Sequence, residues 1–335
     1  MQIEFTHRQS AHCESGVTAN LISHHCSEVS EALAFGIGAG LFFAYLPFIK
    51  LNDLPMTTFR AATGAILNRT MKNLGITLQR QKFGDPNMAM DELDRVLESG
   101  TPVGLQTGAW FLPYFPPAYR FHFNMHNMVV FGKEGDEYLI SDPVFPDAVR
   151  CDRDNLMKAR YTKGALAPKG RMYYVTGVPY QLDLPPAVRT GIRKACREML
   201  KIPLPIAGVK GMRFLARRMV DWPQKFGDKK AILCLGQLVR MQEEIGTGGA
   251  GFRFIYAAFL QEAATILGED RLKGCSEELT SIGDRWRDFA VIAARNCKGR
   301  AGEHDTYTHM SEIIYDCAER EEKLYHELQE IIGLR

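Results

Sequence analysis

The stretch His12-Cys13-Glu14-Ser15-Gly16, followed by the mainly apolar run Val17–Ile22, predicts a helix that begins with a cysteine. Its apolar residues fall on one side of a helix that extends to about His25. At such a position the unpaired N–H groups and the positive end of the helix dipole favour a thiolate. We therefore interpret Cys13 as a candidate nucleophile, the alternative being a small buried core residue.

Two later stretches supply partners for a cysteine nucleophile. The segment His-Asn-Met-Val-Val-Phe-Gly begins at His126, and Ile-Ser-Asp-Pro places an acid at Asp142. If a hairpin turn centres near Gly135, residue 142 lies opposite residue 128, so Asp142 is diagonal to His126 on the same face. An acid there would orient His126, so we interpret Cys13, His126 and Asp142 together as a catalytic triad, with His122 as the second-ranked base. Taken singly, His126 could be a structural histidine and Asp142 part of a strand-ending turn.

Composition favours two domains and leaves the partner class open. The chain has 335 residues, 46% of them hydrophobic, and a formal net charge of +2. Such a balance gives no overall reason to expect nucleic acid or a membrane as a partner. Eight cysteines without a Cys-x-x-Cys pair favour reduced thiols in a cytoplasmic protein, and no apolar secretory segment precedes Cys13.

Local patterns predict an α+β domain over residues 1–180 and a helical domain over residues 181–335. Further helices are expected from near Ser27 and over Arg60–Leu74 and Pro86–Leu97. The predicted strands of an antiparallel sheet are Pro102–Thr107, Asn124–Phe131, Glu137–Ser141 and Arg171–Thr176. The predicted helices of the second domain include Ala231–Ile245, Phe252–Leu267, Glu277–Asn296 and Tyr307–Ile332.

The uncharged segment Ala32–Ile49 is long enough to be considered as a possible membrane span. Because it contains three alternating glycines and Pro47, we interpret it as a buried helix broken by a glycine turn. The glycines at positions 36, 38 and 40 lack the spacing of a nucleotide-binding loop and indicate tight packing or a turn. No membrane span is expected.

These residues resemble a known family. His12-Cys13-x-Ser15, with Ser30-Glu31-Ala32-x-Ala34-Phe35-Gly36-x-Gly38-x-Gly40-Leu41, is similar to the N-terminal domain of the butirosin biosynthesis protein H family. The His126 and Asp142 motifs resemble those of papain-like cysteine peptidases, notably bacteriocin-leader peptidases. The segment Gly246–Leu260 resembles the helical domain that commonly follows. The implied fold is a papain-like α+β domain with an antiparallel sheet, followed by an all-α domain.

This resemblance implies an acyltransferase that moves an acyl group from an acyl carrier protein to an amine. It implies Cys13 as the nucleophile, His126 as general base and then acid, and Asp142 as the residue that orients the imidazole. One departure concerns the oxyanion hole, because His7 stands where the peptidases have a glutamine and Gln9 is only four residues before the cysteine.

Other residues are candidates for binding substrates. Glu31 could orient a substrate amine or cap a helix, and Gly246–Gly251 with Arg253 could hold an anion or form a flexible connector. Tyr256, in the same family-like motif, is the third candidate for substrate binding. A set of residues near the N-terminus could be imagined as zinc ligands, but its spacing matches no standard site and we expect no metal. That set is His7, His12, Cys13, His24, His25 and Cys26.

The expected co-substrate is an acyl thioester carrying phosphopantetheine, as an acyl carrier protein or acyl-CoA, with a small-molecule amine as acceptor and no further cofactor. The basic stretch Arg189–Lys230 would attract an acidic carrier, or is simply a solvated helix face. Hydrolysis by the same triad, as an amidase, peptidase or thioesterase, is the alternative activity. A catalytically idle protein that binds a metabolite or carrier is the alternative class, and a homo-oligomer is left open.

Overall fold

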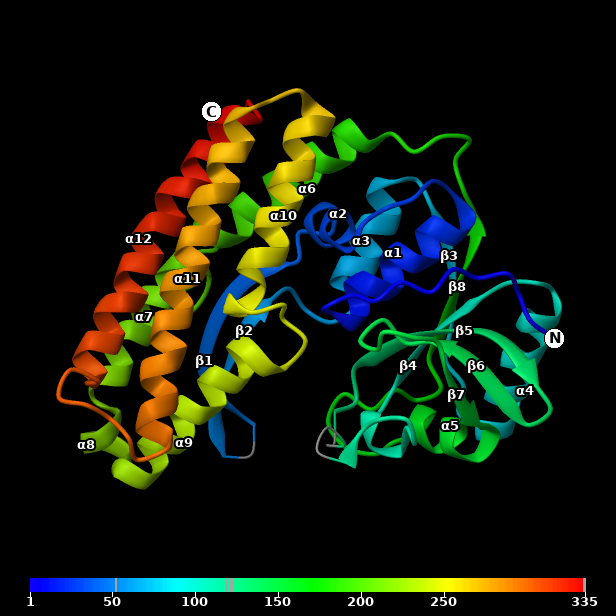
Figure 1. The fold of residues 1–335 in the computed structure, drawn as a ribbon, viewed down its shortest axis with the longest axis horizontal. Coiled ribbons are helices and arrows are strands. Elements are labelled where there is room, and N and C mark those ends of the chain that lie inside the picture. The colour runs from blue at the N-terminus through cyan, green and yellow to red at the C-terminus, as the bar shows by residue number, and fades with distance from the viewer. Residues whose placement is uncertain (52, 118–119, 121–122, 334–335) are drawn as a thin grey trace. The chain divides into compact units, whose positions relative to one another are not determined.

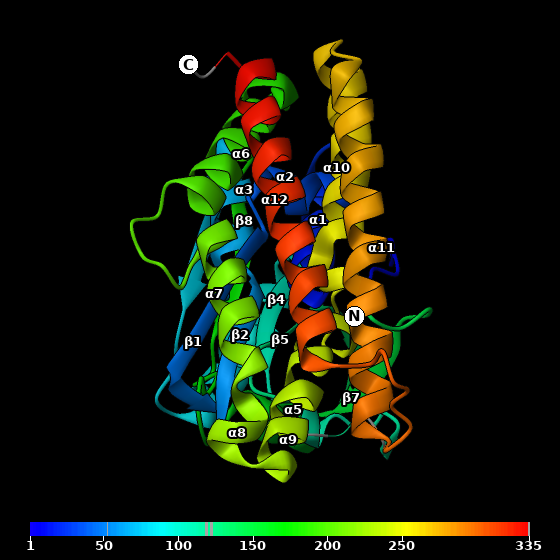
Figure 2. The same ribbon diagram turned by 90° about the vertical axis from the view of Figure 1, so that its left-hand side faces the viewer.

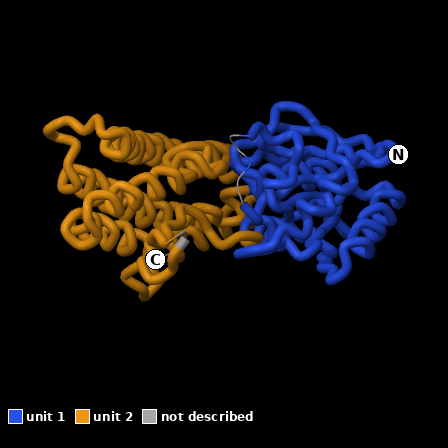
Figure 3. The backbone as a smooth tube through the Cα atoms, turned by 90° about the horizontal axis from the view of Figure 1, so that it is seen from below, with its two compact units in different colours: residues 1–34, 66–183 blue, residues 35–65, 184–335 orange. Residues whose placement is uncertain are grey.

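The computed structural model describes residues 1–51, 53–117, 120 and 123–333, and the chain forms two compact units (Figure 3). Unit 1 comprises residues 1–34 and 66–183, and unit 2 comprises residues 35–65 and 184–335. The sequence prediction assigned all of residues 1–180 to one domain. Residues 35–65 instead belong to unit 2, because the hairpin they form packs against helices that follow residue 184.

Unit 1 is an α+β structure built on one antiparallel sheet (Figure 1). Its strands lie in the order β3-β8-β4-β5-β6-β7, and each neighbouring pair is antiparallel. The strands are β3 (Thr77–Gln81), β4 (Val103–Thr107), β5 (His126–Glu134), β6 (Glu137–Ser141), β7 (Val149–Asp152) and β8 (Met172–Gly177). The helices are α1 (Cys13–His25), α3 (Ala65–Asn73), α4 (Pro86–Glu98), the 3₁₀ turn η1 (Ala109–Phe111) and α5 (Arg153–Arg160), and α2 (Glu31–Ile37) runs from unit 1 into unit 2.

Helices cover both faces of this sheet. On β5, Met128 and Val130 belong to a buried cluster with the apolar side of α4, including Leu93. Successive strand residues point to opposite faces, so Asn127 and Val129 lie on the other face, where α1 packs against β5. The sheet therefore carries α1, with Cys13 in its first turn, on the face opposite α4.

The β5–β6 hairpin contains a bulge that sets its register. Near the turn Glu134 pairs with Glu137, whereas beyond the bulge Val129 pairs with Ser141. The shift lies between Val130 and Gly132, where one extra residue is inserted on β5. Continued by one residue, the second register places Asp142 opposite residue 128, as the sequence predicted.

Unit 2 is mainly helical, with the two-stranded hairpin β1–β2 added to it. Figure 2 shows the long helices α11 and α12 beside one another, and α7 also packs against α12. The elements are β1 (Leu41–Leu51), β2 (Leu54–Arg60), α6 (Leu184–Leu200), α7 (Gly208–Val220), α8 (Trp222–Phe226), α9 (Asp228–Val239), the π-helical turn η3 (Arg240–Glu244), the 3₁₀ turn η4 (Ala250–Phe252), α10 (Arg253–Leu267), α11 (Arg271–Cys297) and α12 (Tyr307–Ile331).

A buried ion pair lies in the core of unit 2. Arg253 and Glu321 have no exposed side-chain surface, and the guanidinium donates to both carboxylate oxygens at 2.9 and 3.1 Å. Trp286 donates its indole N–H to the same carboxylate at 3.1 Å, and Arg253 also donates to the carbonyl oxygen of Gly251 at 2.9 Å. Each guanidinium nitrogen and both carboxylate oxygens therefore have a hydrogen-bond partner, which offsets the cost of burying the charges.

The expected α+β class, the antiparallel sheet and the helical second part are confirmed, but the segment Ala32–Ile49 was predicted wrongly. It is helical only to Ile37 and then becomes strand β1. Gly36 lies against the Phe259 ring, where an added Cβ would come within 2.0 Å, so the glycines do mark tight packing. The start of the predicted helix Arg60–Leu74 is also wrong, since Arg60 ends β2 and α3 begins at Ala65. Among the described residues, no helix has the length and apolarity needed to cross a membrane.

Replacing Glu321 by glutamine should destabilise unit 2 by about 3–5 kcal/mol, because it leaves the Arg253 guanidinium buried without a counter-charge. Chemical unfolding followed by tryptophan fluorescence, to which the buried Trp222 and Trp286 of unit 2 contribute, measures this. The matched control is Asp288→Asn in the exposed pair with Arg285, which should cost less than about 1 kcal/mol. Equal effects of the two substitutions would contradict the assignment.

Candidate active site

The N-terminal segment, which leads into α1 at Cys13, is hydrogen-bonded to the β5–β6 hairpin. Residues 1–3 pair with the bulged part of β5: Ile3 donates to the carbonyl of Phe131 at 2.9 Å, and Lys133 donates to that of Met1 at 2.8 Å. Farther along, the N–H of Ser10 donates to the carbonyl of Pro143 at 2.6 Å. Three residues later the chain enters α1 at Cys13. The hydrogen bond of Ser10 therefore fixes the start of α1 close to the end of β6.

Gly16 permits this close approach. A Cβ at Gly16 would lie 2.6 Å from the Cβ of Ser10 and 2.7 Å from that of Pro143. Such distances are too short for any side chain, so only glycine allows the first turn of α1 to lie against the N-terminal segment and the end of the hairpin. Steric exclusion of a side chain therefore explains why residue 16, three residues after Cys13, is glycine.

Glu31 holds the loop before α1. Its carboxylate accepts from the backbone N–H groups of Ala11 and His12, both at 2.8 Å, and from the Ser15 hydroxyl at 3.0 Å. Burial raises the pKa of Glu31, and these hydrogen bonds oppose the rise. Both carboxylate oxygens are engaged by the segment before α1 and by its first turn, whereas at the start of α2 the Ser30 hydroxyl accepts from the N–H of Leu33.

His126 and Asp142 form a buried pair. Nε2 of His126 lies 2.6 Å from Oδ2 of Asp142, and both side chains are almost inaccessible to solvent. Because an ionised carboxylate only accepts, Nε2–H is the donor, which directs Nδ1 away from Asp142. The hydroxyl of Tyr114 donates to the same Oδ2 at 2.9 Å, and the N–H of Val144 donates to Oδ1 at 3.3 Å.

The charge of Asp142 changes the protonation of the imidazole. Burial alone would lower the pKa of His126, but the attraction and hydrogen bond of Asp142, with smaller contributions from Cys13, raise it to about 10. The ring is therefore protonated at neutral pH and can stabilise a thiolate. Since its ordinary pKa is 6.5, the protonated ring stabilises the fold fully below about pH 6.5, and this contribution is lost as the pH rises through about 10.

The Cys13 sulfur lies at the beginning of β5. It lies 4.0 Å from the carbonyl oxygen of Met125, the residue before His126, and it contributes to the raised pKa of the His126 imidazole. Nδ2 of Asn127 is 3.9 Å from the sulfur. The structure therefore brings together the three residues that the sequence assigned to a triad, while His122 lies outside the described residues.

His7 stands at the sequence position where an oxyanion-hole side chain is expected, but its imidazole is hydrogen-bonded to other groups. Nδ1 of His7 lies 2.7 Å from the Ser141 hydroxyl, and Nε2 lies 3.1 Å from the carbonyl oxygen of Phe145. With both ring nitrogens engaged, His7 supports the segment around Asp142. Gln9 is exposed.

Arg253 and Tyr256 do not fit the substrate-binding role predicted for them. Both are completely buried in unit 2, and Arg253 is bound by Glu321. The carboxylate neutralises the guanidinium, so it is not available to an anion at the Gly246–Gly251 segment. The sequence missed this because the partner of Arg253 lies 68 residues away. Within the described residues, no group of His, Cys, Asp and Glu side chains could hold a metal ion.

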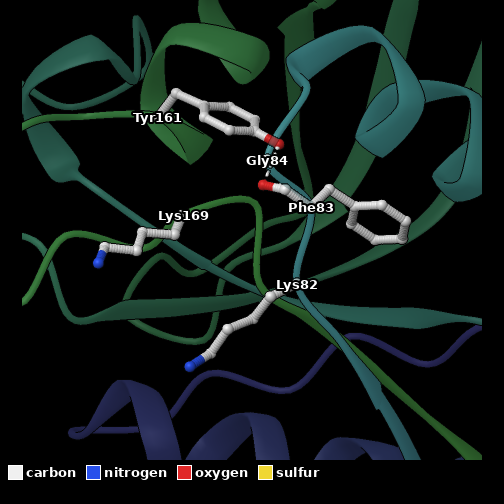
Figure 4. Close-up of a pocket in the computed structure, with 5 residues that line it drawn as sticks. All are labelled: Lys82, Phe83, Gly84, Tyr161 and Lys169. Carbon is white, nitrogen blue, oxygen red and sulfur yellow. Dashed lines mark hydrogen bonds between the residues drawn. The ribbon is translucent and has the colours of Figure 1, made fainter.

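A separate pocket of about 360 Å³ in unit 1 has no residue in common with this site (Figure 4). It is lined by Lys82, Phe83, Gly84, Tyr161 and Lys169. Figure 4 shows the Tyr161 hydroxyl directed at the backbone carbonyl of Phe83, to which it donates at 2.9 Å. The hydroxyl also donates to the carbonyl oxygen of Asp85 at 3.0 Å, so it holds the loop that follows β3.

A helix headed by cysteine, packed on an antiparallel sheet that carries a His–Asp pair, is the arrangement of papain-like cysteine enzymes. The chain belongs to the family described as "Domain of unknown function (DUF4872)", whose model matches residues 154–328, more than half of the 335 residues. Residues 12–143 match the model described as "Butirosin biosynthesis protein H, N-terminal". The resemblance to this biosynthetic family, predicted from the sequence, is confirmed.

Among solved structures, the chain is similar to the crystal structure of a Bacillus anthracis protein assigned as a C39-like peptidase. The identity is 15% and the TM-score 0.38, and the match covers 53% of this chain and all of the other. Among curated proteins, none is significantly similar.

Replacing Asp142 by asparagine should lower the pKa of His126 by about two pH units, because the ring loses a buried counter-charge. Nuclear magnetic resonance titration of ¹⁵N-labelled histidine measures this directly. Asp136→Asn, which removes an exposed carboxylate at the turn of the same hairpin, should leave the titration unchanged. An unchanged titration in Asp142→Asn would show that the carboxylate does not control the ring.

Proposed function

We propose that the protein is a cysteine-dependent acyltransferase of biosynthesis, which moves an acyl group from a carrier-protein or coenzyme A thioester to an amine. The observation that carries this proposal is the 2.6 Å contact between His126 and Asp142 beside the sulfur of Cys13. The match to a butirosin biosynthesis protein model supports a biosynthetic substrate over a peptide.

In the first half-reaction the Cys13 thiolate attacks the thioester carbonyl and forms a new S–C bond. The tetrahedral intermediate collapses by breaking the bond to the donor sulfur, which takes the proton of the His126 imidazolium and leaves as a thiol. An acyl-Cys13 enzyme and a neutral imidazole remain. Exchange of one thioester for another is nearly isoenergetic, so the acyl-enzyme is within reach of such a donor.

In the second half-reaction an amine attacks the acyl-Cys13 carbonyl. Neutral His126 takes a proton from the attacking nitrogen, the carbonyl–sulfur bond breaks, and the amide leaves. The thiolate and the imidazolium are regenerated together. Asp142 holds the ring orientation in both steps and stabilises the cation each time it forms.

The N-terminal turn of α1 supplies backbone N–H groups for the developing oxyanion. The first N–H groups of a helix have no partner within the helix, and that of Cys13 belongs to the attacking residue itself. Glu31 and the Ser15 hydroxyl fix this turn, so these donors are held in place before the acyl donor arrives.

Incubation with acyl thioesters should add one acyl mass to the protein, and Cys13→Ala should abolish the addition. Intact-mass spectrometry measures this. Cys26→Ala, which changes the thiol just after the same helix, is the matched control and should retain the adduct. Addition of amines should then discharge the adduct as amide. Discharge by water alone would make the protein a hydrolase, and absence of any adduct would contradict covalent catalysis.

The exposed basic residues of α7 form the proposed contact for the acyl donor. Arg213 is held by Glu322 at 2.6 Å, whereas Arg217 and Arg218 are exposed. Charge reversal of both exposed arginines should raise the KM for an acidic carrier protein by about tenfold or more, with little change in kcat. Reversal of exposed Lys298 and Arg300 is the control. An unchanged KM would remove α7 from the donor-binding surface.

A further inference from the structure

Asn127 follows His126 on β5 and has its side chain on the opposite face of the strand, where α1 packs. The residue is buried, with 5% of its surface exposed. Nδ2 lies 3.9 Å from the sulfur of Cys13 and donates to the carbonyl oxygen of Met125 at 3.0 Å. The amide of Asn127 is therefore a polar neighbour of the sulfur, on the strand that begins with His126.

The surroundings fix which end of the amide faces the sulfur. Oδ1 of Asn127 accepts from the Tyr173 hydroxyl at 3.0 Å. In the flipped orientation Oδ1 would face the carbonyl oxygen of Met125, and two acceptors would oppose one another at 3.0 Å. The N–H end is therefore held toward the sulfur from two directions.

Tyr173 is itself locked in place. Its ring lies over Gly104, where an added Cβ would come within 2.1 Å of the ring, so glycine at this position admits the tyrosine. Burial, with smaller contributions from Glu14 and Cys13, raises the pKa of Tyr173 well above its ordinary value. The hydroxyl consequently keeps its proton and remains a donor to Oδ1.

We propose that Asn127 is a further catalytic residue, whose amide N–H donates to the Cys13 thiolate, and that Tyr173 is a positioning residue that orients this amide. The inference rests on the nucleophilic role of Cys13 in the proposed function. In that cycle His126 is neutral while the acyl-enzyme exists, and it is still accepting a proton when the sulfur departs. An amide does not titrate, so Asn127 supplies a donor to the departing thiolate throughout this step.

The test is the pH dependence of Cys13 alkylation by iodoacetamide, followed at this residue by peptide mass spectrometry. Asn127→Asp keeps the shape but places an acceptor and a negative charge beside the sulfur. It should slow alkylation at pH 6.5 by about tenfold or more, and move the midpoint of the profile upward by about one pH unit. Asn127→Leu, which removes the donor without adding charge, should move the midpoint in the same direction by less.

Tyr173→Phe keeps the ring over Gly104 and removes only the hydroxyl, so it tests the positioning role even if an Asn127 variant folds poorly. It should shift the midpoint upward by a fraction of the Asn127→Asp shift. Tyr174→Phe, the next residue on β8 with its side chain on the opposite face, is the matched control and should leave the profile unchanged. Superimposable profiles for the parent, Asn127→Asp and Tyr173→Phe proteins would overturn the proposal.

Alkylation needs no acyl donor, so the experiment tests the role of Asn127 independently of the proposed acyltransferase activity. If the profiles shift as expected but no thioester ever acylates Cys13, the acyltransferase proposal fails and the role of Asn127 stands. If thioesters acylate Cys13 but the profiles coincide, the acyltransferase proposal stands and Asn127 is only a packing residue.

Discussion

The hydrogen bond between Nε2 of His126 and Oδ2 of Asp142 depends on one inserted residue in β5. The pairing that starts at the turn of the hairpin would place residue 142 opposite residue 129, with its side chain on the wrong face of the sheet for His126. The bulge between Val130 and Gly132 shifts the register by one and returns Asp142 to the face of His126. The 2.6 Å contact, and with it the protonated imidazole, is a consequence of this bulge.

The same hairpin positions the nucleophile. The first residues of the chain pair with the bulged region, where Gln2 forms a bridge with Gly132, and Ser10 is hydrogen-bonded to Pro143 just after β6. From there Glu31 fixes the entry into α1 through Ala11, His12 and Ser15. The β5–β6 hairpin therefore positions both the cysteine and the His–Asp pair. In this way residues that are distant in the sequence are held in a defined geometry.

The sequence was most informative where the determinants are local. The helix from Cys13 to His25, the strand Glu137–Ser141 and the pairing of His126 with Asp142 follow from periodicity, turn residues and side-chain alternation. Strand β1 was missed because an uninterrupted apolar run fits a buried strand as well as a buried helix. The hydrogen bonds of Glu31 and Asn127 and the ion pair of Arg253 join residues that are distant in the chain, and no local pattern corresponds to them.

The central claim is that the environment of Cys13, rather than its exposure, makes it the reactive thiol. The most direct test is competitive alkylation of all eight cysteines of the folded protein at pH 6, resolved by peptide mass spectrometry. The account predicts that buried Cys13 is modified before exposed Cys297, because His126 provides Cys13 with a cationic partner, and the structure shows none of that kind for Cys297 among the residues it describes. Modification of Cys297 first, with Cys13 unreactive until the protein unfolds, would contradict it.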